Sequence, residues 1–316
     1  MAVALSRISM RVPTERDLAA EAVARSRGPA IDQRLLSRVL KLEKSPRLAA
    51  DDRMIDLILD AGREALGDLR PSMVLYGHTL LLQPFGHRDE FGPMARGRLG
   101  LAADVPVYGI SRIGCTSVLR AADLARRYLV RPGAAREEAV LILGGDQGTM
   151  AGTLRVIPPY AVCGDAAAAF VMRCDAGRYR FLGTAAGRDT RFHRNARMTE
   201  DEVRKFGASS TSNVVKVIDA ALASAALKRC DVDWIMPHMA NAVMWRNVCR
   251  ALRFDLDKVY LDLLPELGHM FGIDALAALQ HADHSGRLVP GQRCLLVAVG
   301  QGAFFQATVV EVLPEL

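Results

Sequence analysis

The chain has 316 residues, of which 50% are hydrophobic and 24% charged, and its formal net charge is +6 at pH 7. This balanced composition, without a low-complexity tract, excludes a disordered or fibrous protein and is typical of a well-packed enzyme. The positive charge could serve an acidic partner, such as a carrier protein or an anionic surface, or could belong to an ordinary solvated surface. Charge alone therefore selects no function.

The amino terminus and the cysteines indicate the compartment. The segment MAVALSRISMRVPTERD carries Arg7 and Arg11 before any long apolar run, so it predicts neither a signal peptide nor a membrane anchor. The six cysteines form no CxxC pair and no Cys/His metal pattern, which favours a reducing compartment and no bound metal. We expect a cytoplasmic protein that binds neither membrane nor nucleic acid.

In the first half of the chain, helical periodicity gives way to strand–helix alternation. Apolar residues at three- and four-residue spacing predict helices at 15–27, 31–44 and 51–66. Short apolar runs closed by glycine, with an amphipathic segment among them, predict strands at 72–77, 105–109 and 139–144 and a helix at 116–130. This alternation indicates an α/β fold with a parallel sheet.

The second half repeats the pattern in outline. Its predicted strands are 166–172, 179–185, 232–237, 258–263, 294–299 and 308–312, and its predicted helices are 212–228, 241–252 and 271–282. We therefore expect two α/β halves, residues 1–175 and 176–316, packed as one body with a site where their strand ends meet.

Cys115 has an unusual local context. A strand ends near Gly109, a turn contains Gly114, and the cysteine opens an amphipathic helix whose start Thr116 and Ser117 could cap. The amino terminus of a helix presents unpaired N–H groups and partial positive charge, which favour a reactive thiolate. An isolated cysteine is more often an ordinary buried residue, so other segments must support a catalytic role.

Several segments after residue 70 follow the order and spacing of one family. They are GGD (144–146), CGDAAAAFVM (163–172), PHMAN (237–241), LGHMFGIDALAAL (267–279) and VAVGQGAFFQATVV (297–310). With the cysteine at the head of a helix, they make the chain resemble the β-ketoacyl-acyl carrier protein synthase III group of the thiolase superfamily, which includes chalcone synthases. The first 70 residues match this family poorly.

The resemblance implies a thiolase-like fold, two similar α/β halves layered α-β-α-β-α, and an acyl group carried on Cys115 as a thioester. It implies His238 as the catalytic histidine, and it places His269 where the family usually has a catalytic asparagine. The chain is thereby expected to be an acyltransferase that either condenses acyl groups or passes them to a hydroxyl or amine, in polyketide-like, specialised or fatty acid biosynthesis. Thioester chemistry also needs oxyanion donors, for which we predict the backbone N–H groups of Cys115 and Gln301.

The acyl donor remains open between coenzyme A and a carrier protein. The family's coenzyme A-binding arginine would fall at Val243, which disfavours coenzyme A. Arg246, Arg250 and Arg253 lie on one face of a predicted helix and could dock an acidic acyl carrier protein, although such a row is often only a solvated face. The thioester is a substrate, so no resident cofactor is expected, and the family implies a homodimer acting on a small-molecule acceptor.

Three alternatives remain less favoured. A hydrolase elbow needs glycine two residues before and after the nucleophile, and Ile113 and Ser117 stand there. The glycines of 144–148 do not form the GxGxxG pattern of a nucleotide-binding oxidoreductase. A non-catalytic partner subunit of a condensing complex is a third possibility, but such a subunit is expected to lack the nucleophile, and Cys115 is present.

Overall fold

The computed structural model describes residues 2–25, 32–80, 90–150, 155–157, 161–194 and 197–315. Its main feature is a ten-stranded sheet in the order β12-β13-β14-β11-β1-β10-β7-β5-β6, with β2 also paired to β10. In chain order the strands are β1 (Val3–Leu5), β2 (Ser9–Arg11), β5 (Met73–Gly77), β6 (Val107–Ile110), β7 (Ala139–Asp146), β10 (Ala166–Cys174), β11 (Tyr179–Arg188), β12 (Trp234–Met236), β13 (Arg293–Gly300) and β14 (Phe304–Val312). The α/β class is thus confirmed.

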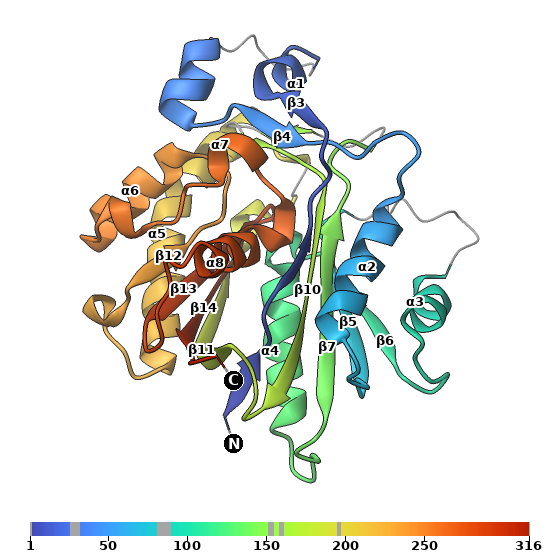
Figure 1. Ribbon diagram of the computed structural model, residues 1–316. Coiled ribbons are helices and arrows are strands. Elements are labelled where there is room, and N and C mark those ends of the chain that lie inside the picture. The colour runs from blue at the N-terminus through green and yellow to red at the C-terminus, as the bar shows by residue number, and fades with distance from the viewer. Residues whose placement is uncertain are drawn as a thin grey trace.

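Helices cover the outer faces of the two halves of the sheet, and further helices form a middle layer between these halves (Figure 1). Against the half that contains β7 and β10 lies α2 (Met54–Leu66), which also contacts α3 (Phe91–Leu99). Against β11 and β14 lies α5 (Glu200–Ser224), which contacts α6 (Ala242–Leu252). In the middle layer, α4 (Ser117–Leu129) contacts strands of both halves, and α8 (Asp274–His284) packs on β12 and β13. The predicted α-β-α-β-α layering is therefore present.

The amino terminus joins the two halves of the sheet. β1 pairs with β10 on one side and with β11 on the other, and β2 pairs with β10. The sequence did not predict these strands, because three residues are too short to show an alternating pattern. The turn between β10 and β11 contains residue 175, where the sequence divides the chain into its two predicted halves.

Three predicted elements differ from the structure. The helix predicted at 15–27 begins only at Ala19, because residues 16–18 form a short strand. The strand predicted at 258–263 is wrong: η6 (Leu256–Lys258) precedes a single bridge at Val259, and α7 (Leu264–Leu267) follows. Pro265 lies in the first turn of α7, where proline favours a helix start. The helix predicted at 31–44 is largely replaced by the π-helical η1 (Leu35–Leu40), which ends at Lys41 with φ of 61°, and by the following strand β4 (Lys44–Pro46).

Smaller elements complete the described chain. β3 (Arg16–Leu18) pairs with β4, α1 (Ala19–Arg25) follows β3, and β8 (Val156–Ile157) pairs with β9 (Ala161–Val162). The remaining short helices are η2 (Gly114–Thr116), η3 (Thr190–Phe192), η5 (Arg229–Asp231) and η7 (Phe271–Ile273).

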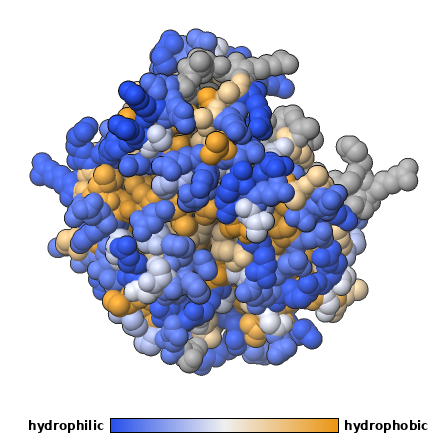
Figure 2. All heavy atoms as spheres, turned by 45° about the horizontal axis from the view of Figure 1, so that its top comes forward, coloured by the Kyte–Doolittle hydropathy of each residue, from blue (hydrophilic) through white to orange (hydrophobic). Residues whose placement is uncertain are grey.

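Within the described ranges, no helix is long and apolar enough to cross a membrane. The face obtained by tilting the top of Figure 1 forward is mostly hydrophilic, with hydrophobic patches between the polar groups (Figure 2).

Candidate active site

Cys115 lies in the middle of η2, directly before α4, and only 5% of the residue is exposed. The chain thus places the thiol at a helix amino terminus, as predicted. The predicted capping role of Thr116 and Ser117 is wrong, because no side chain caps α4. Instead the Thr116 hydroxyl donates to the carbonyl of Ile113, and the Ser117 hydroxyl is buried without a hydrogen-bond partner among the described residues.

The turn after β13 packs directly against the residue before Cys115. A Cβ on Gly114 would lie 2.7 Å from the Cα of Gly300 and 2.9 Å from the backbone nitrogen of Gln301. A Cβ on Gly300 would lie 3.1 Å from the backbone nitrogen of Cys115. Only two glycines allow this approach, and Gly114 also has φ of +58°. The backbone segments of Cys115 and Gln301 are thereby adjacent, which the predicted pair of oxyanion donors requires.

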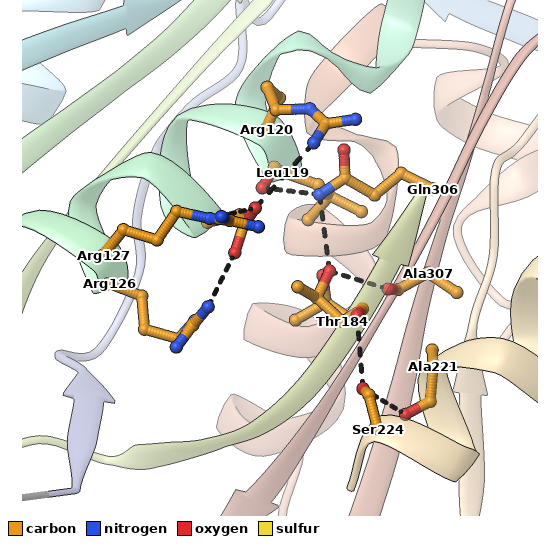
Figure 3. A network of polar contacts seen from close by, with 11 residues as sticks. Leu119, Arg120, Arg126, Arg127, Thr184, Ala221, Ser224, Gln306 and Ala307 are labelled. Atoms are coloured by element: carbon orange, nitrogen blue, oxygen red, sulfur yellow. Dashed lines mark hydrogen bonds and ion pairs between the residues drawn. The ribbon is translucent and has the colours of Figure 1, made fainter. Parts of the chain in front are cut away.

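Strand β14 also holds α4, the helix that follows Cys115. The fully buried Gln306 donates a 2.9 Å hydrogen bond from Nε2 to the carbonyl of Leu119, one turn beyond Cys115 (Figure 3). On the next strand, Thr184 donates to the carbonyl of Ala307. These bonds tie α4 to β14 and β11, so the Gln301 turn and Cys115 share one rigid support.

His269 faces Cys115 from the loop between α7 and η7. Its Nε2 lies 3.4 Å from the Sγ of Cys115. The backbone fixes this position, because the His269 N–H donates to the carbonyl of Val162 and the His269 carbonyl accepts from the N–H of Gly164. The substitution of histidine at this motif position therefore puts an imidazole beside the thiol.

Asp274, which the sequence analysis did not single out, completes the group. At the start of α8 and 2% exposed, it accepts a 2.6 Å hydrogen bond from His269 Nδ1. Its carboxylate also accepts from the backbone N–H groups of Met239 and Met270, at 2.7 and 2.6 Å. A carboxylate only accepts, so Nδ1 of His269 carries a proton and Nε2 is the nitrogen that faces the sulfur. Cys115, His269 and Asp274 thus lie in one line of contacts, the arrangement that a nucleophile, a base and an orienting carboxylate require.

His238, the third residue predicted from the sequence, lies beside the Cys115–His269–Asp274 contacts but is not part of them. Its ring centroid lies 4.6 Å from that of His269, and its Nδ1 lies 3.5 Å from the Asp274 Oδ2 without making a hydrogen bond among the described residues. Trp245 of α6 donates from Nε1 to the His238 carbonyl at 2.8 Å, which anchors its backbone. The site therefore brings together all three residues predicted from the sequence, with His238 at its side.

The surroundings push the pKa values of the two histidines apart. Burial opposes a charge on His269, but the carboxylate of Asp274 and the neighbouring Cys115 outweigh burial and raise the pKa of His269 well above its usual value. Burial and the charge of His269 lower the pKa of His238 to about 3, although Asp274 acts in the other direction. At neutral pH we therefore expect a charged His269 and a neutral His238. Two neighbouring groups whose pKa values differ in this way can take separate acid and base roles.

The same atoms could suggest a metal site, since ligand atoms of His238, His269 and Asp274 lie within 4.8 Å of one another. Two ligands on one tetrahedral zinc ion stand about 3.3 Å apart, given metal–ligand distances near 2 Å. His269 Nδ1 and Asp274 Oδ2 are 2.6 Å apart, the length of a charge-assisted hydrogen bond. This distance fits a proton relay better than a metal centre.

The predicted carrier-docking arginines lie on and after α6. Arg250 is exposed and Arg246 partly buried. Arg253 follows the last residue of α6 with φ of 54°, so it does not continue the helical row. The arginines thus form a looser basic surface than regular helical spacing predicts.

Known proteins of one family resemble this chain in sequence. The family profile described as 3-oxoacyl-acyl-carrier-protein (ACP) synthase III C terminal matches residues 222–312. A β-ketoacyl-acyl-carrier-protein synthase III of Rhodospirillum rubrum is 26% identical over 275 residues, covering 80% of this chain and 83% of that protein. One from Paramagnetospirillum magneticum is 34% identical over 101 residues, covering 32% of this chain and 31% of that protein.

Solved structures agree on the fold. ChlB3, described as an acyltransferase, superposes with a TM-score of 0.85 at 19% identity, covering 99% of this chain and 98% of that one. The 3-oxoacyl-(acyl carrier protein) synthase III of Pseudomonas aeruginosa gives a TM-score of 0.79 at 18% identity, covering 100% and 99%. The chain is therefore similar in sequence to β-ketoacyl-acyl-carrier-protein synthase III enzymes, and it has their fold.

Proposed function

We propose that this protein takes an acyl group from a carrier-bound thioester onto Cys115 and passes it to a hydroxyl or amine of a small-molecule acceptor. The observation that supports this proposal is the continuous contact from Cys115 Sγ through His269 to Asp274, at 3.4 and 2.6 Å. An orienting carboxylate behind a histidine is the arrangement that moves protons between a nucleophile, a leaving group and an acceptor. Simple acyl transfer needs all three of these proton movements.

Each half-reaction balances with these groups alone. The Cys115 thiolate attacks the donor carbonyl, the backbone N–H groups of Cys115 and Gln301 stabilise the oxyanion, and His269 gives its proton to the departing carrier thiol. Neutral His269 then takes the proton of the acceptor O–H or N–H as that atom attacks the acyl-Cys115. Expulsion of the Cys115 thiolate restores the ion pair.

Acylation itself prepares His269 for the second step. The pKa of His269 is raised partly by Cys115, besides Asp274. Once Cys115 is a neutral thioester, that contribution is lost and the imidazole releases its proton more easily. His269 is thus an acid when the donor thiol leaves and a base when the acceptor attacks.

Decarboxylative condensation is the second candidate. It is favoured by the two histidines, whose rings lie 4.6 Å apart beside Cys115, because an enolate oxygen needs two hydrogen-bond donors. A neutral His238 can still donate one hydrogen bond from its protonated nitrogen. Transfer is preferred because His269 already directs one nitrogen to Asp274 and the other to Cys115.

The experiment offers an acetyl and a malonyl carrier thioester together with an alcohol or amine acceptor. Mass spectrometry follows acyl-Cys115, the acylated acceptor and carbon dioxide. Transfer without carbon dioxide release supports the proposal, whereas stoichiometric carbon dioxide from malonyl thioester with carbon–carbon bond formation overturns it in favour of condensation. An intact-mass experiment with no adduct on any thioester would instead favour a non-catalytic subunit.

We also propose an acyl carrier protein as donor partner, a role in specialised metabolite assembly, and a homodimer. The relatives' names include an acyl carrier protein, and the exposed Arg250 and Arg253 could form ion pairs with an acidic carrier.

The described sheet ends at β6, where Tyr108 is 56% exposed, and an open edge strand can pair with a second copy of the chain. Light scattering at micromolar concentration tests the dimer, and salt-dependent acylation by a carrier-bound donor tests docking.

A further inference from the structure

A cavity lies beside the carboxyl-terminal end of α4, between this helix, β1, β11 and the end of α5. Its volume is about 240 Å³. Figure 3 shows four of the side chains that line it: Arg126 and Arg127 on α4, Thr184 on β11 and Ser224 on α5. At about 1.5 Å per helical residue, Arg127 lies roughly 18 Å along the helix axis from Cys115. The cavity is therefore separate from the active site.

Two guanidinium groups are held beside this cavity by fixed contacts. The buried carboxylate of Asp123 accepts a hydrogen bond from Arg126 Nη2 at 3.2 Å and one from Arg127 Nε at 3.1 Å. The Arg126 guanidinium also lies 5.5 Å from the ring centroid of Phe181, another residue of the cavity wall. These contacts orient the planar donors in advance, so little rotamer freedom is lost when they bind a ligand.

The two arginines keep most of their N–H groups available. A guanidinium has five N–H donors, and within the described part of the chain each of the two hydrogen-bonds only to Asp123. The carbonyls near the ends of the two helices are already bonded, since those of Arg126 and Ala221 accept from the N–H groups of Val130 and Ala225. The cavity therefore has an excess of donors, which a strong acceptor such as an oxyanion would satisfy.

The other walls suit a small organic molecule. The Thr184 hydroxyl donates to the carbonyl of Ala307, and the Ser224 hydroxyl donates to a carbonyl within α5, so both oxygens can still accept a hydrogen bond from a ligand. The apolar part of the lining consists of Ala2, Val3, Val130, Phe181 and Leu182. Sites for drug-sized ligands have volumes of about 300–1,000 Å³, so this cavity suits a smaller molecule.

We propose that this cavity binds a small organic anion, whose carboxylate or phosphate group is held by Arg126 and Arg127 and whose body packs against the apolar wall. The proposal does not depend on acyl transfer, because none of the lining residues belongs to the Cys115–His269–Asp274 contacts. Thr184 also takes part in the hydrogen bonds that tie α4 to β14 and β11 (Figure 3). The bound anion would thus lie against the support of the helix that follows Cys115.

The test measures binding by isothermal titration calorimetry at low salt. The probes are benzoate and phenyl phosphate, with acetate and inorganic phosphate as anions that lack an apolar body and benzamide as the neutral analogue of benzoate. Arg126→Gln removes one guanidinium, whereas Ser224→Met narrows the cavity and keeps both. Arg98→Gln is the matched control, because Arg98 is also a partly exposed arginine in the last turn of a helix and is paired with an aspartate. Circular dichroism checks that each variant is folded.

Benzoate or phenyl phosphate should bind more tightly than acetate and inorganic phosphate, and the tighter of the two identifies the anionic group. Arg126→Gln should weaken this binding at least about tenfold, because a hydrogen bond to a charged group is lost. Ser224→Met should also weaken it, and Arg98→Gln should leave it unchanged. Benzamide binding as tight as that of benzoate would overturn the proposal. Unchanged affinity in Ser224→Met would overturn it too, since the anion would then lie on the surface and not in the cavity.

A last variant separates this cavity from the active site. The raised pKa of His269 gives the active site a cation that could also attract an anion. His269→Ala removes that cation, and anion binding of wild-type affinity in this variant supports the cavity as the site. Loss of binding in His269→Ala would place the anion beside Cys115 and overturn the proposal. Because calorimetry needs no acyl transfer, failure of the proposed function would leave this result unaffected.

Discussion

Two aspartates beside or within α4 are equally buried, at 2% exposure, but have very different partners. Asp123, in the middle of the helix, is surrounded by the guanidinium groups of Arg120, Arg126 and Arg127. Asp274, beside the amino-terminal end that carries Cys115, faces two histidines and two backbone N–H groups.

The partners decide what each carboxylate can do. Arginine keeps its charge at every accessible pH, so the Asp123 cluster is electrostatically fixed. Histidine changes charge near neutrality, so the Asp274 cluster can hold or release a proton. Burial of a carboxylate alone therefore does not indicate catalysis, and the ability of its partners to titrate is the distinguishing property.

The largest expected effect comes from replacing Cys115, which lies near Asp274. Cys115→Ala should abolish the acyl adduct completely while the protein stays folded, because only the sulfur forms the thioester. Intact mass after exposure to an acyl thioester is the measurement. Cys294→Ala, which removes another buried thiol far from the site, should retain the full adduct. An undiminished adduct in Cys115→Ala would show that another residue is acylated.

The next effect compares the two carboxylates directly. Asp274→Asn should lower the rate of acyl transfer on the order of 10³-fold or more, because an amide cannot hold the His269 tautomer or stabilise its charge. Asp123→Asn should leave the rate unchanged. The rate of acceptor acylation at saturating donor is the measurement, with melting curves for both variants. Equal losses would mean that the two sites differ in no chemical respect.

The pH dependence should distinguish the histidines. Burial with the charge of His269 lowers the pKa of His238 to about 3, whereas Asp274 and Cys115 raise that of His269 above its usual value. A raised pKa adds stability that is complete below the unfolded value of about 6.5 and is lost as pH rises through the folded value. A lowered pKa acts oppositely, because the unfolded chain binds the proton of His238 first and destabilises the fold below about pH 6.5.

Histidine NMR titration measures both values. His269 should remain protonated through neutral pH, and His238 should stay neutral down to about pH 3. In Asp274→Asn the pKa of His269 should fall, since burial then dominates. An ordinary titration of His269 in the wild-type protein would contradict the ion-pair description.

The sequence was sufficient for the parts of the site that motifs mark. Cys115 at a helix start and His238 in PHMAN stand at positions with a recognisable surrounding pattern, and the structure brings them together with His269. Asp274 was missed because an acidic residue in the first turn of a helix is usually a favourable helix charge. The signal was its position five residues after His269, next to a loop whose backbone N–H groups needed an acceptor.

The fold was predictable where periodicity is long and less so elsewhere. The predicted helix at 51–66 and strand at 139–144 correspond to α2 and β7, both amply long for a period to show. The missed β1 depends on pairing with strands more than 150 residues away in sequence, which no local pattern encodes. The packing of Phe271 beside Cys115 likewise joins segments far apart in the chain.

The smallest expected effect concerns the stability of the Asp123 cluster. Its arginines are exposed by 31 to 65%, so solvent and salt screen their attraction, and Asp123→Asn should cost only about 1 kcal/mol of unfolding free energy. Urea denaturation at low and at high salt measures this cost, which should shrink as salt rises. Asp274→Asn should show a loss that salt does not change, because its partners are fully buried. A salt-dependent loss at Asp274 would mean that water and ions reach this carboxylate. Solvent access, rather than the ability of the partners to titrate, would then be what distinguishes the two aspartates.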